Sequence, residues 1–369
     1  MKNKIFFSCF ISIWLILIVL NFIIKTPEFS EAENRYVAKL PKITMESLLN
    51  GEFSKQMDTY INDHFVFRDK WLNIRAAFER TLGKDEISNV YIGKEGYLFE
   101  KFTEENVDRD SISYKINKIN EFKNKTDTNI YITLVPNSIY INRDKLPENA
   151  TTFNQKDVIE DIYNKLEINK INVIDTLEKN KNNKLYFKLD HHMTSKGAYL
   201  VYEKITKDML NKDTNENDYI KEKVTDSFYG TFYSKVNLKS LKPDDIYIYK
   251  NKNVKVTSAV YDNREKKSIY NFNYLKKKDK YSMFLDGNHA ISVIKTDVKN
   301  GKKLLVIKDS YAHILSQFLI NDYEEIHFLD LRYYNMPASS YIKENNIENV
   351  LLLYNVTNFI SDIAIKNIR

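Results

Sequence analysis

The sequence predicts an α/β fold, with a mostly parallel sheet flanked by helices, a β-rich insertion and an apolar helix at the N-terminus. Three observations support this class. Apolar strand-length runs alternate with helix-like segments in 129–210 and again in 302–359, which is the pattern of parallel βα units. Tyrosine-rich segments of strand length crowd the region from about 220 to 300. Residues 5–24 form one continuous apolar run.

The N-terminal run "IFFSCFISIWLILIVLNFII" is about as long as a bilayer-spanning helix at ~1.5 Å rise per residue. Lys2 and Lys4 precede it, so residues 1–4 are expected in the cytoplasm and the chain from Lys25 onward outside the cell. A cleaved signal peptide is the alternative, but the run is long and no small-x-small site follows it. We therefore expect a single-pass signal anchor at 5–24 in the cell membrane, with the remainder extracellular.

The composition of the chain limits the classes of partner that we expect it to bind. Lysine and arginine total 56 against 50 acidic residues, and the surplus of 6 is spread along the chain, so nucleic acid is not an expected partner. The only cysteine, Cys9, lies in the apolar run, which leaves the rest without disulfides or thiolate chemistry.

Beyond the anchor, residues 25–125 are expected to form a stalk and an N-terminal helical and hairpin region, with the hairpin at 90–100. Residues 126–369 are expected to form the α/β domain. Its predicted elements are a strand within 129–141, a helix at 154–169, a strand at 171–176, a strand end at 185–194, a helix at 194–210, insertion strands at 245–250, 255–262, 268–275, 281–287 and 290–296, a strand and helix in 302–320, a strand in 324–331, a helix near 338–346 and a strand in 347–359.

The segment "KLDHHMTSKGAYL" places Asp190, His191 and His192 together in a chain with six histidines. In extended chain, residues two apart project to the same side, so Asp190 can orient the ring of His192 while His191 points away. The other imidazole nitrogen of His192 is then available to take a proton from a serine.

A metal site is the alternative for this tripeptide, because Asp, His and His form a legitimate ligand set. Such a site needs further ligands from other strand ends, and neither Asp286 nor His289 belongs to a recognisable second motif. We therefore expect no metal and no other cofactor.

Ser310 follows an apolar strand and opens a helix, and ligands of open α/β sheets collect at the carboxyl ends of the strands. The N–H groups of that first helical turn are suited to an oxyanion. The alternative is that Asp309 and Ser310 simply cap the helix.

The order "LDHHMTSKGAY" then "VIKDSYA", with "IGKEGYLF" and "TLVPNSIYI" upstream, resembles the DHHW proteins of Gram-positive bacteria. These are similar to the alginate O-acetyltransferase group of SGNH hydrolase-like proteins. The resemblance implies an SGNH-hydrolase-like, flavodoxin-like α/β fold. Met193 stands where the family name has tryptophan, which concerns the lining of the pocket.

Carried over residue by residue, the resemblance implies Ser310 as nucleophile, His192 as general base and Asp190 as its orienting carboxylate. Asn355 is expected to supply an oxyanion-hole amide, although strand-end asparagines commonly close turns. Arg332 is a candidate contact for carbohydrate or carboxylate, or else a surface arginine. Further candidates lie in the insertion, where glycine allows close approach to substrate or serves a turn: Gly230, Gly287, Asn288 and His289.

The resemblance implies an extracytoplasmic O-acetyltransferase of a cell-surface polysaccharide that works through an acyl-serine. A polysaccharide is then the acceptor, and a multi-pass membrane acyltransferase is the partner that delivers the acetyl group. A carbohydrate esterase or deacetylase of the same fold is one alternative. The other is a non-catalytic polysaccharide-binding scaffold in a surface-assembly complex.

Overall fold

The computed structural model describes residues 2–369, so Met1, the first residue of the expected cytoplasmic segment, lies outside the described residues. The chain divides into two compact units. One contains the residues up to Ile87 together with Tyr233–Leu241, and the other contains Ser88–Phe232 and Lys242–Arg369.

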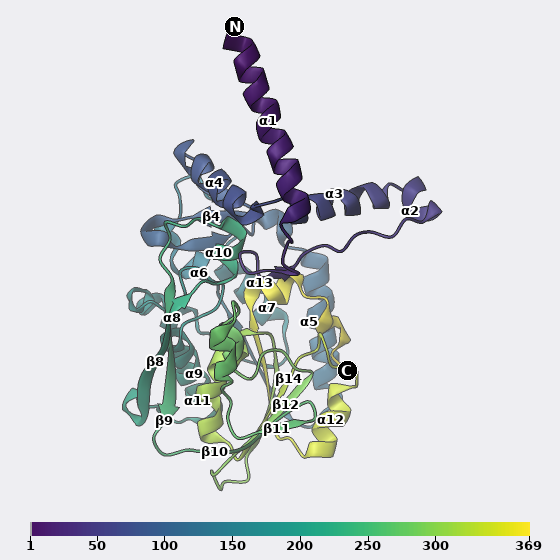
Figure 1. Ribbon diagram of the computed structural model, residues 1–369. Coiled ribbons are helices and arrows are strands. Elements are labelled where there is room, and N and C mark those ends of the chain that lie inside the picture. The colour runs from purple at the N-terminus through teal and green to yellow at the C-terminus, as the bar shows by residue number, and fades with distance from the viewer. Residues whose placement is uncertain (1) are drawn as a thin grey trace. The chain divides into compact units, whose positions relative to one another are not determined.

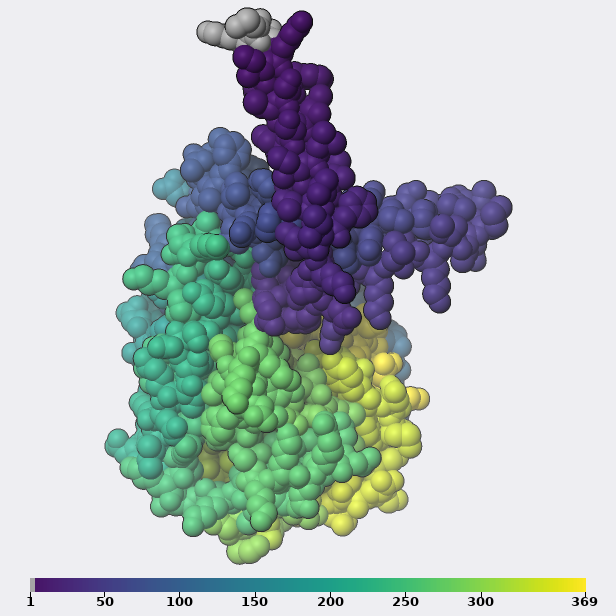
Figure 2. All heavy atoms as spheres, in the orientation of Figure 1, coloured from purple at the N-terminus to yellow at the C-terminus, as the bar shows by residue number. Residues whose placement is uncertain are grey.

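The first unit is mainly helical, with three very short strands. Its elements are α1 (Lys2–Ile23), β1 (Phe29–Ser30), β2 (Arg35–Tyr36), α2 (Met45–Leu49), α3 (Glu52–His64), α4 (Arg68–Thr81) and β3 (Glu86–Ile87). Within residues 2–369, Lys4–Ile23 is the one helical stretch long and apolar enough to cross a membrane. Its apolar side chains are exposed along the helix (Figure 2). A membrane anchor and a signal sequence both have these features.

The second unit is built on one large sheet with the strand order β11-β10-β12-β14-β13-β15-β6-β7. The strands from β14 through β7 in this order run parallel, whereas β12, β10 and β11 are antiparallel additions at one side. Their bounds are β6 (Asn129–Val135), β7 (Asn169–Lys170), β10 (Val256–Tyr261), β11 (Arg264–Lys266), β12 (Ile291–Thr296), β13 (Lys303–Lys308), β14 (Glu325–Leu329) and β15 (Asn349–Asn355).

The central strands are apolar on both faces because both faces are covered by helices. In β13, Leu304 and Val306 belong to one buried cluster while Leu305 and Ile307 belong to another, as the period of two in a strand requires. The first cluster includes α9 (Ser195–Leu210) and α11 (Tyr311–Leu319). The second includes residues of α5 (Arg109–Lys123), α7 (Gln155–Lys165), α12 (Ala338–Asn345) and α13 (Val356–Ser361).

Figure 1 shows these layers, with α9 and α11 on one side of the strands and α5 and α12 on the other. The predicted α/β class, with a mostly parallel sheet between helices, is confirmed. The shorter elements of this unit are β4 (Val90–Ile92) and β5 (Leu98–Glu100), which pair as a hairpin, α6 (Ser138–Ile141) and α8 (Ile174–Lys179). The helix α10 (Thr231–Val236) crosses the boundary between the units along the chain.

The tyrosine-rich region contains two different structures. The strands β8 (Tyr219–Phe228) and β9 (Asp244–Asn251) pair with each other in a two-stranded sheet, whereas β10, β11 and β12 extend the central sheet. The predicted strands at 268–275 and 281–287 are wrong, because these segments form 3-10 turns at Phe272–Lys276 and Tyr281–Met283. The side chain of Asn271 accepts the N–H of Asn273 and so starts the first turn.

Two other expectations differ from the structure. The strand predicted at 171–176 is wrong: the short strand β7 ends just before it, and α8 begins within it because the side chain of Asn172 accepts the N–H of Ile174 and begins a helical turn. The helix α5, assigned from the sequence to the stalk region 25–125, contributes Ile119 and Phe122 to the core of the second unit. That unit therefore begins well before residue 126.

The order of the parallel strands brings several polar residues to one edge of the sheet. Asn137, Ser310, Arg332 and Asn355 lie at or just beyond the carboxyl ends of β6, β13, β14 and β15. These four strands are neighbours in the sheet, which makes this edge the expected place for a ligand.

Candidate active site

The Asp190-His191-His192 tripeptide lies in a tight loop, which corrects the expectation of a strand end. An isolated bridge joins Tyr186 to Met193 and closes the loop, and the backbone bends at each residue from 188 to 192. Thr194 then caps α9 by accepting the N–H of Gly197 at 3.3 Å. Met193 is buried in the core, so its difference from tryptophan affects packing and does not alter an exposed pocket wall.

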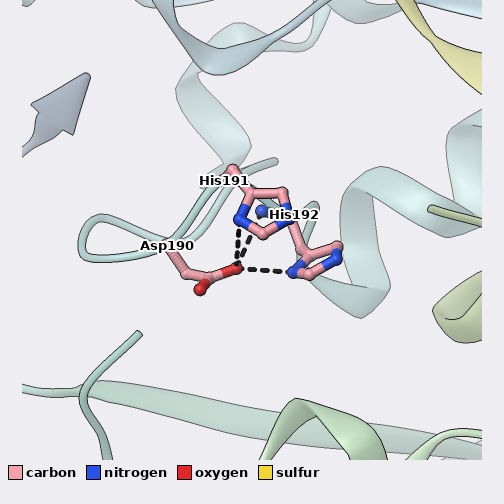
Figure 3. Close-up of side chains that lie close together, drawn as sticks. All are labelled: Asp190, His191 and His192. Carbon is pink, nitrogen blue, oxygen red and sulfur yellow. Dashed lines mark hydrogen bonds and ion pairs between the residues drawn. The ribbon is translucent and has the colours of Figure 1, made fainter. Parts of the chain in front are cut away.

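The carboxylate of Asp190 holds His192. Its Oδ1 lies 2.6 Å from Nδ1 of His192 and accepts the backbone N–H of the same residue at 3.0 Å (Figure 3). Because the loop is bent, His191 does not point away as expected. Its ring lies beside that of His192 with the centroids 3.7 Å apart, and its Nδ1 is 3.6 Å from the same carboxylate oxygen.

The second carboxylate oxygen of Asp190 is held by Thr231, a residue that no sequence motif indicates. The Thr231 backbone N–H donates to Oδ2 at 2.7 Å, and the Thr231 hydroxyl donates at 3.0 Å. A Cβ on the preceding Gly230 would overlap the Asp190 side chain. The role expected for Gly230, close approach to substrate, is therefore corrected: its missing side chain leaves room for Asp190.

Ser310 lies on the opposite side of the His192 ring. Its Oγ is 2.8 Å from Nε2 of His192. Ser310 makes no side-chain cap bond to α11, and Asp309 accepts the N–H of Tyr311 at 2.8 Å in its place. The structure thus brings Asp190, His192 and Ser310 together in one hydrogen-bonded line, and it does not support simple capping by Ser310.

Two tyrosines complete the surroundings of the imidazole. The ring of Tyr281 stacks on His192 with centroids 3.5 Å apart and an angle of 11° between the planes, and its hydroxyl donates to the Ser310 carbonyl at 3.0 Å. The hydroxyl of Tyr311 donates to the His191 carbonyl at 2.6 Å. These contacts fix the ring of His192 relative to Ser310. No local sequence signal identified Tyr281.

The electrostatics suit a base at neutral pH. Burial lowers the pKa of His192 to about 4, and His191 acts in the same direction while Asp190 opposes both. Burial alone would raise the pKa of Asp190, but the two histidines and the Thr231 amide outweigh it and hold that pKa below its usual range. At pH 7 the pair is therefore a carboxylate and a neutral imidazole, whose Nε2 can accept the Ser310 proton.

The side chain of Asn355 has partners within the protein, which favour a capping role over the expected role in an oxyanion hole. Its Nδ2 donates to Asp309 Oδ2 at 2.8 Å, and its Oδ1 accepts the N–H of Asn358 at 2.9 Å as the N-cap of α13. Only 1% of Asn355 is exposed. Asn137 lies closer to an open surface and places its Nδ2 3.3 Å from both Asn355 Oδ1 and the Tyr311 hydroxyl.

Arg332 contacts a carboxylate of the protein itself. Its Nε and Nη2 donate to the two oxygens of Asp330 at 2.8 and 2.6 Å. Asp330 also accepts from the buried Lys308 at 3.2 Å, and Lys308 lies 2.9 Å from Nε2 of His313. Burial lowers the pKa of Lys308. About a third of the Arg332 side chain is exposed.

The remaining insertion candidates serve local structure. Gly287 has a φ of +85°, and a Cβ there would meet Ser282 and Tyr274 only at ordinary van der Waals distances of about 3.5 Å, so it is a turn glycine. His289 lies 2.8 Å from Asp262 and 3.1 Å from the Asp286 carbonyl. Asn288 is 3.5 Å from Nη2 of Arg332.

The geometry of the tripeptide fits hydrogen bonding better than metal binding. Asp190, His191 and His192 offer ligand atoms within 4.8 Å of one another. Two ligand atoms about 2.1 Å from one ion at a tetrahedral angle stand roughly 3.4 Å apart. The 2.6 Å between Asp190 Oδ1 and His192 Nδ1 is shorter, as expected for a charge-assisted hydrogen bond.

A small cavity of about 50 Å³ lies next to these residues. His191 and Asn137 contribute to its wall, together with the rings of Phe99, Phe102 and Phe232. Aromatic rings and amides are both suited to contacts with a sugar or a short acyl group.

Comparison with known proteins places the chain in a family. The family described as DHHW protein matches residues 82–329. A solved DHHW family protein from Eubacterium siraeum is 26% identical, with a TM-score of 0.66 over 77% of this chain and 96% of that one. Bacillus cereus PatB1, solved with a sulfonyl adduct, is 21% identical, with a TM-score of 0.64 over 76% and 98%. No curated protein matches the chain. This chain belongs to the DHHW family.

Proposed function

We propose that this protein is an extracytoplasmic O-acetyltransferase of a cell-surface polysaccharide that acts through an acyl-serine. The observation that carries the proposal is the line of contacts from Asp190 through His192 to Ser310, at 2.6 and 2.8 Å. A serine, a neutral imidazole and a buried carboxylate in this order are the components of acyl transfer on many folds.

In the first half-reaction, Ser310 Oγ attacks the carbonyl carbon of an acetyl donor while His192 Nε2 takes the hydroxyl proton. Ser310 begins α11, whose positive dipole end favours the oxyanion of the tetrahedral intermediate. The intermediate collapses as the bond to the leaving group breaks and His192 returns the proton to that group. Asp190 remains ionised and stabilises the transient imidazolium.

In the second half-reaction, a sugar hydroxyl attacks the acetyl-serine while His192 takes its proton. Collapse releases the acetylated sugar and returns the proton to Ser310 Oγ. The cavity of about 50 Å³ beside His191, with its aromatic rings and amides, supports a bound acetyl group near this reaction.

The supply of acetyl groups requires a partner in this proposal. Since the extracellular space holds no acetyl-CoA pool, a multi-pass membrane acyltransferase delivers the acetyl group to Ser310. The apolar helix α1 supports an anchor beside such a partner, and Lys2 and Lys4 in its first turn favour an N-terminus inside the cell.

Transfer is tested against hydrolysis by giving the full chain 4-nitrophenyl acetate with and without a panel of oligosaccharides. A bound hydroxyl acts at high effective concentration, so a matching oligosaccharide should accelerate turnover and become acetylated. Ser310→Ala serves as the inactive control. Fast hydrolysis that no saccharide accelerates would assign the chain to the carbohydrate esterases instead.

Two other outcomes separate the remaining alternatives. Loss of turnover on chelation, with activity retained in Ser310→Ala, would favour a metal at Asp190, His191 and His192. Saccharide binding without any turnover or serine acylation would favour a non-catalytic scaffold.

A further inference from the structure

The helix α4 carries a stripe of large apolar side chains that face solvent. Trp71 is 44% exposed, Ile74 57% and Phe78 61%, and Phe67 and Leu82 at the two ends are 42% and 62% exposed. These residues recur every three or four positions, so they share one face of the helix. A contiguous apolar surface of this kind marks an interaction site.

The other side of α4 is already packed. Ala76 is 2% exposed, and Leu72 and Asn73 are half-buried. The helix therefore does not need the stripe to attach itself to its own unit. The stripe thus consists of Phe67, Trp71, Ile74, Phe78 and Leu82.

Hydrogen bonds connect the start of α4 to the end of the apolar helix α1. The N–H of Val66, just before α4, donates to Oδ1 of Asn21 in the last turn of α1 at 2.8 Å. Thr26, just after α1, donates its hydroxyl to the His64 carbonyl at 3.3 Å. Figure 1 shows α3 and α4 running in different directions from this end of α1. A bilayer that contains α1 thus ends where α4 begins.

The chemistry of the stripe suits the boundary between lipid and water. Trp71 satisfies its indole N–H by donating to the Val66 carbonyl at 3.1 Å, which allows the ring to enter an apolar phase. Lys70 and Arg75 lie at the margins of the stripe, where cations meet lipid phosphates. Tryptophan is also enriched at membrane interfaces.

We propose that α4 is a second membrane contact, with its stripe inserted among the phospholipid acyl chains at the outer surface of the bilayer. The occupant is phospholipid because the stripe continues from the end of a membrane-spanning helix and has basic margins. The inference rests on the proposed anchor α1. Its effect is to fix the chain that follows the anchor against the membrane surface.

The two tryptophans of the chain allow a direct test. In full-length protein reconstituted into vesicles of phosphatidylcholine and phosphatidylglycerol, Trp14→Phe leaves Trp71 as the only reporter and Trp71→Phe leaves Trp14. Lipids brominated near the headgroup end of the acyl chain should quench Trp71 more than lipids brominated near its middle. Trp14, in the centre of α1, should show the reverse order, and aqueous iodide should quench neither strongly.

A matched pair of variants in the Trp14→Phe background sharpens the result. Phe78→Ser on the stripe should reduce the quenching of Trp71 by bromolipid about twofold or more, because it removes apolar area from the contact. Ala77→Ser, on another face of the same helix, should leave it unchanged.

Each other outcome overturns the inference in a distinct way. If iodide quenches Trp71 and bromolipid does not, the stripe lies in water. If neither quenches Trp71, the stripe is covered by protein. If only Trp71 escapes the bromolipids, the anchor stands and the stripe contact is wrong. If Trp14 escapes them as well, the anchor fails together with the contact.

Discussion

The carboxyl ends of β13 and β15 have the same local design but use their polar side chains differently. Each parallel strand turns directly into a helix, with Ser310 beginning α11 and Asn355 beginning α13. Asn355 accepts an N–H of its helix and is 1% exposed. Ser310 makes no such bond and directs its Oγ to His192.

Asp309 explains this difference. One of its oxygens accepts the N–H of Tyr311 at the start of α11, and the other accepts the N–H and the side chain of Asn355. Because the neighbouring carboxylate satisfies the helix, the Ser310 hydroxyl is available for chemistry. Capping and reactivity compete for one side chain, and the contacts of a strand-end residue show which role it has.

Ser310→Ala should give the largest effect, a loss of at least ~10³-fold in turnover of an activated acetyl ester, because the nucleophile is removed. The midpoint of urea unfolding should change little, since Ser310 caps nothing. Ser361→Ala, which removes the hydroxyl of an exposed serine in α13, is the control for both measurements. Retained turnover in Ser310→Ala would remove Ser310 from the mechanism.

Asp190→Asn should lower kcat by ~10²–10⁴-fold, because an amide no longer fixes the imidazole tautomer that accepts the serine proton. Thr231→Ser keeps the donors to Asp190 Oδ2 and should stay close to the parent rate. The comparison is made by steady-state kinetics with the same ester. An Asp190→Asn enzyme as fast as Thr231→Ser would contradict the role of the carboxylate.

The pH dependence should reflect the buried imidazole. With the pKa of His192 at about 4, below its ordinary value of 6.5, the neutral base is present at neutral pH and kcat/KM should be flat there. Activity should fall about tenfold per pH unit once the pH drops below that pKa, because a protonated imidazole accepts no proton. A midpoint near 6.5 would show that burial does not control His192.

Asn355→Ala should give the smallest effect on activity and a measurable effect on stability. It removes the N-cap of α13 and one of the donors to the buried Asp309, so the free energy of unfolding should fall by about 1–3 kcal/mol. The rate per folded molecule should change only a few-fold, and urea unfolding beside active-site titration separates the two quantities. A rate loss as large as that of Ser310→Ala would restore Asn355 to the oxyanion hole.

The sequence alone predicts those parts of the candidate site that depend on a local residue pattern. The strand-to-helix pattern makes Ser310 a candidate, and the spacing of two residues pairs Asp190 with His192, whereas the family resemblance is what implies that the three act together. Thr231 and Tyr281 were missed because their bonds to the site span 41 and 29 residues. Gly230 was noticed, but its reason is the volume of a side chain 40 positions earlier in the chain.

For the fold, too, features that depend on local pattern are predicted from the sequence, and features that depend on distant partners are not. The apolar runs of β13 and β15 predicted parallel strands covered on both faces. The strands β10 and β12 were also recognised, but a strand's own pattern does not say which sheet it joins. The pairing of β12 with β14, and of β10 with β12, depends on partners outside each segment, and so the sequence suggested a separate insertion.

The most direct test of the central claim is to find the acyl-enzyme. The full chain is mixed with an activated acetyl ester, quenched in acid and digested, and the acetyl group is located by mass spectrometry. We expect one acetyl group on Ser310, formed and lost at rates that both fall in His192→Ala, because one imidazole serves both half-reactions. Acetylation of other residues alone, with ester turnover unchanged in Ser310→Ala, would contradict the account.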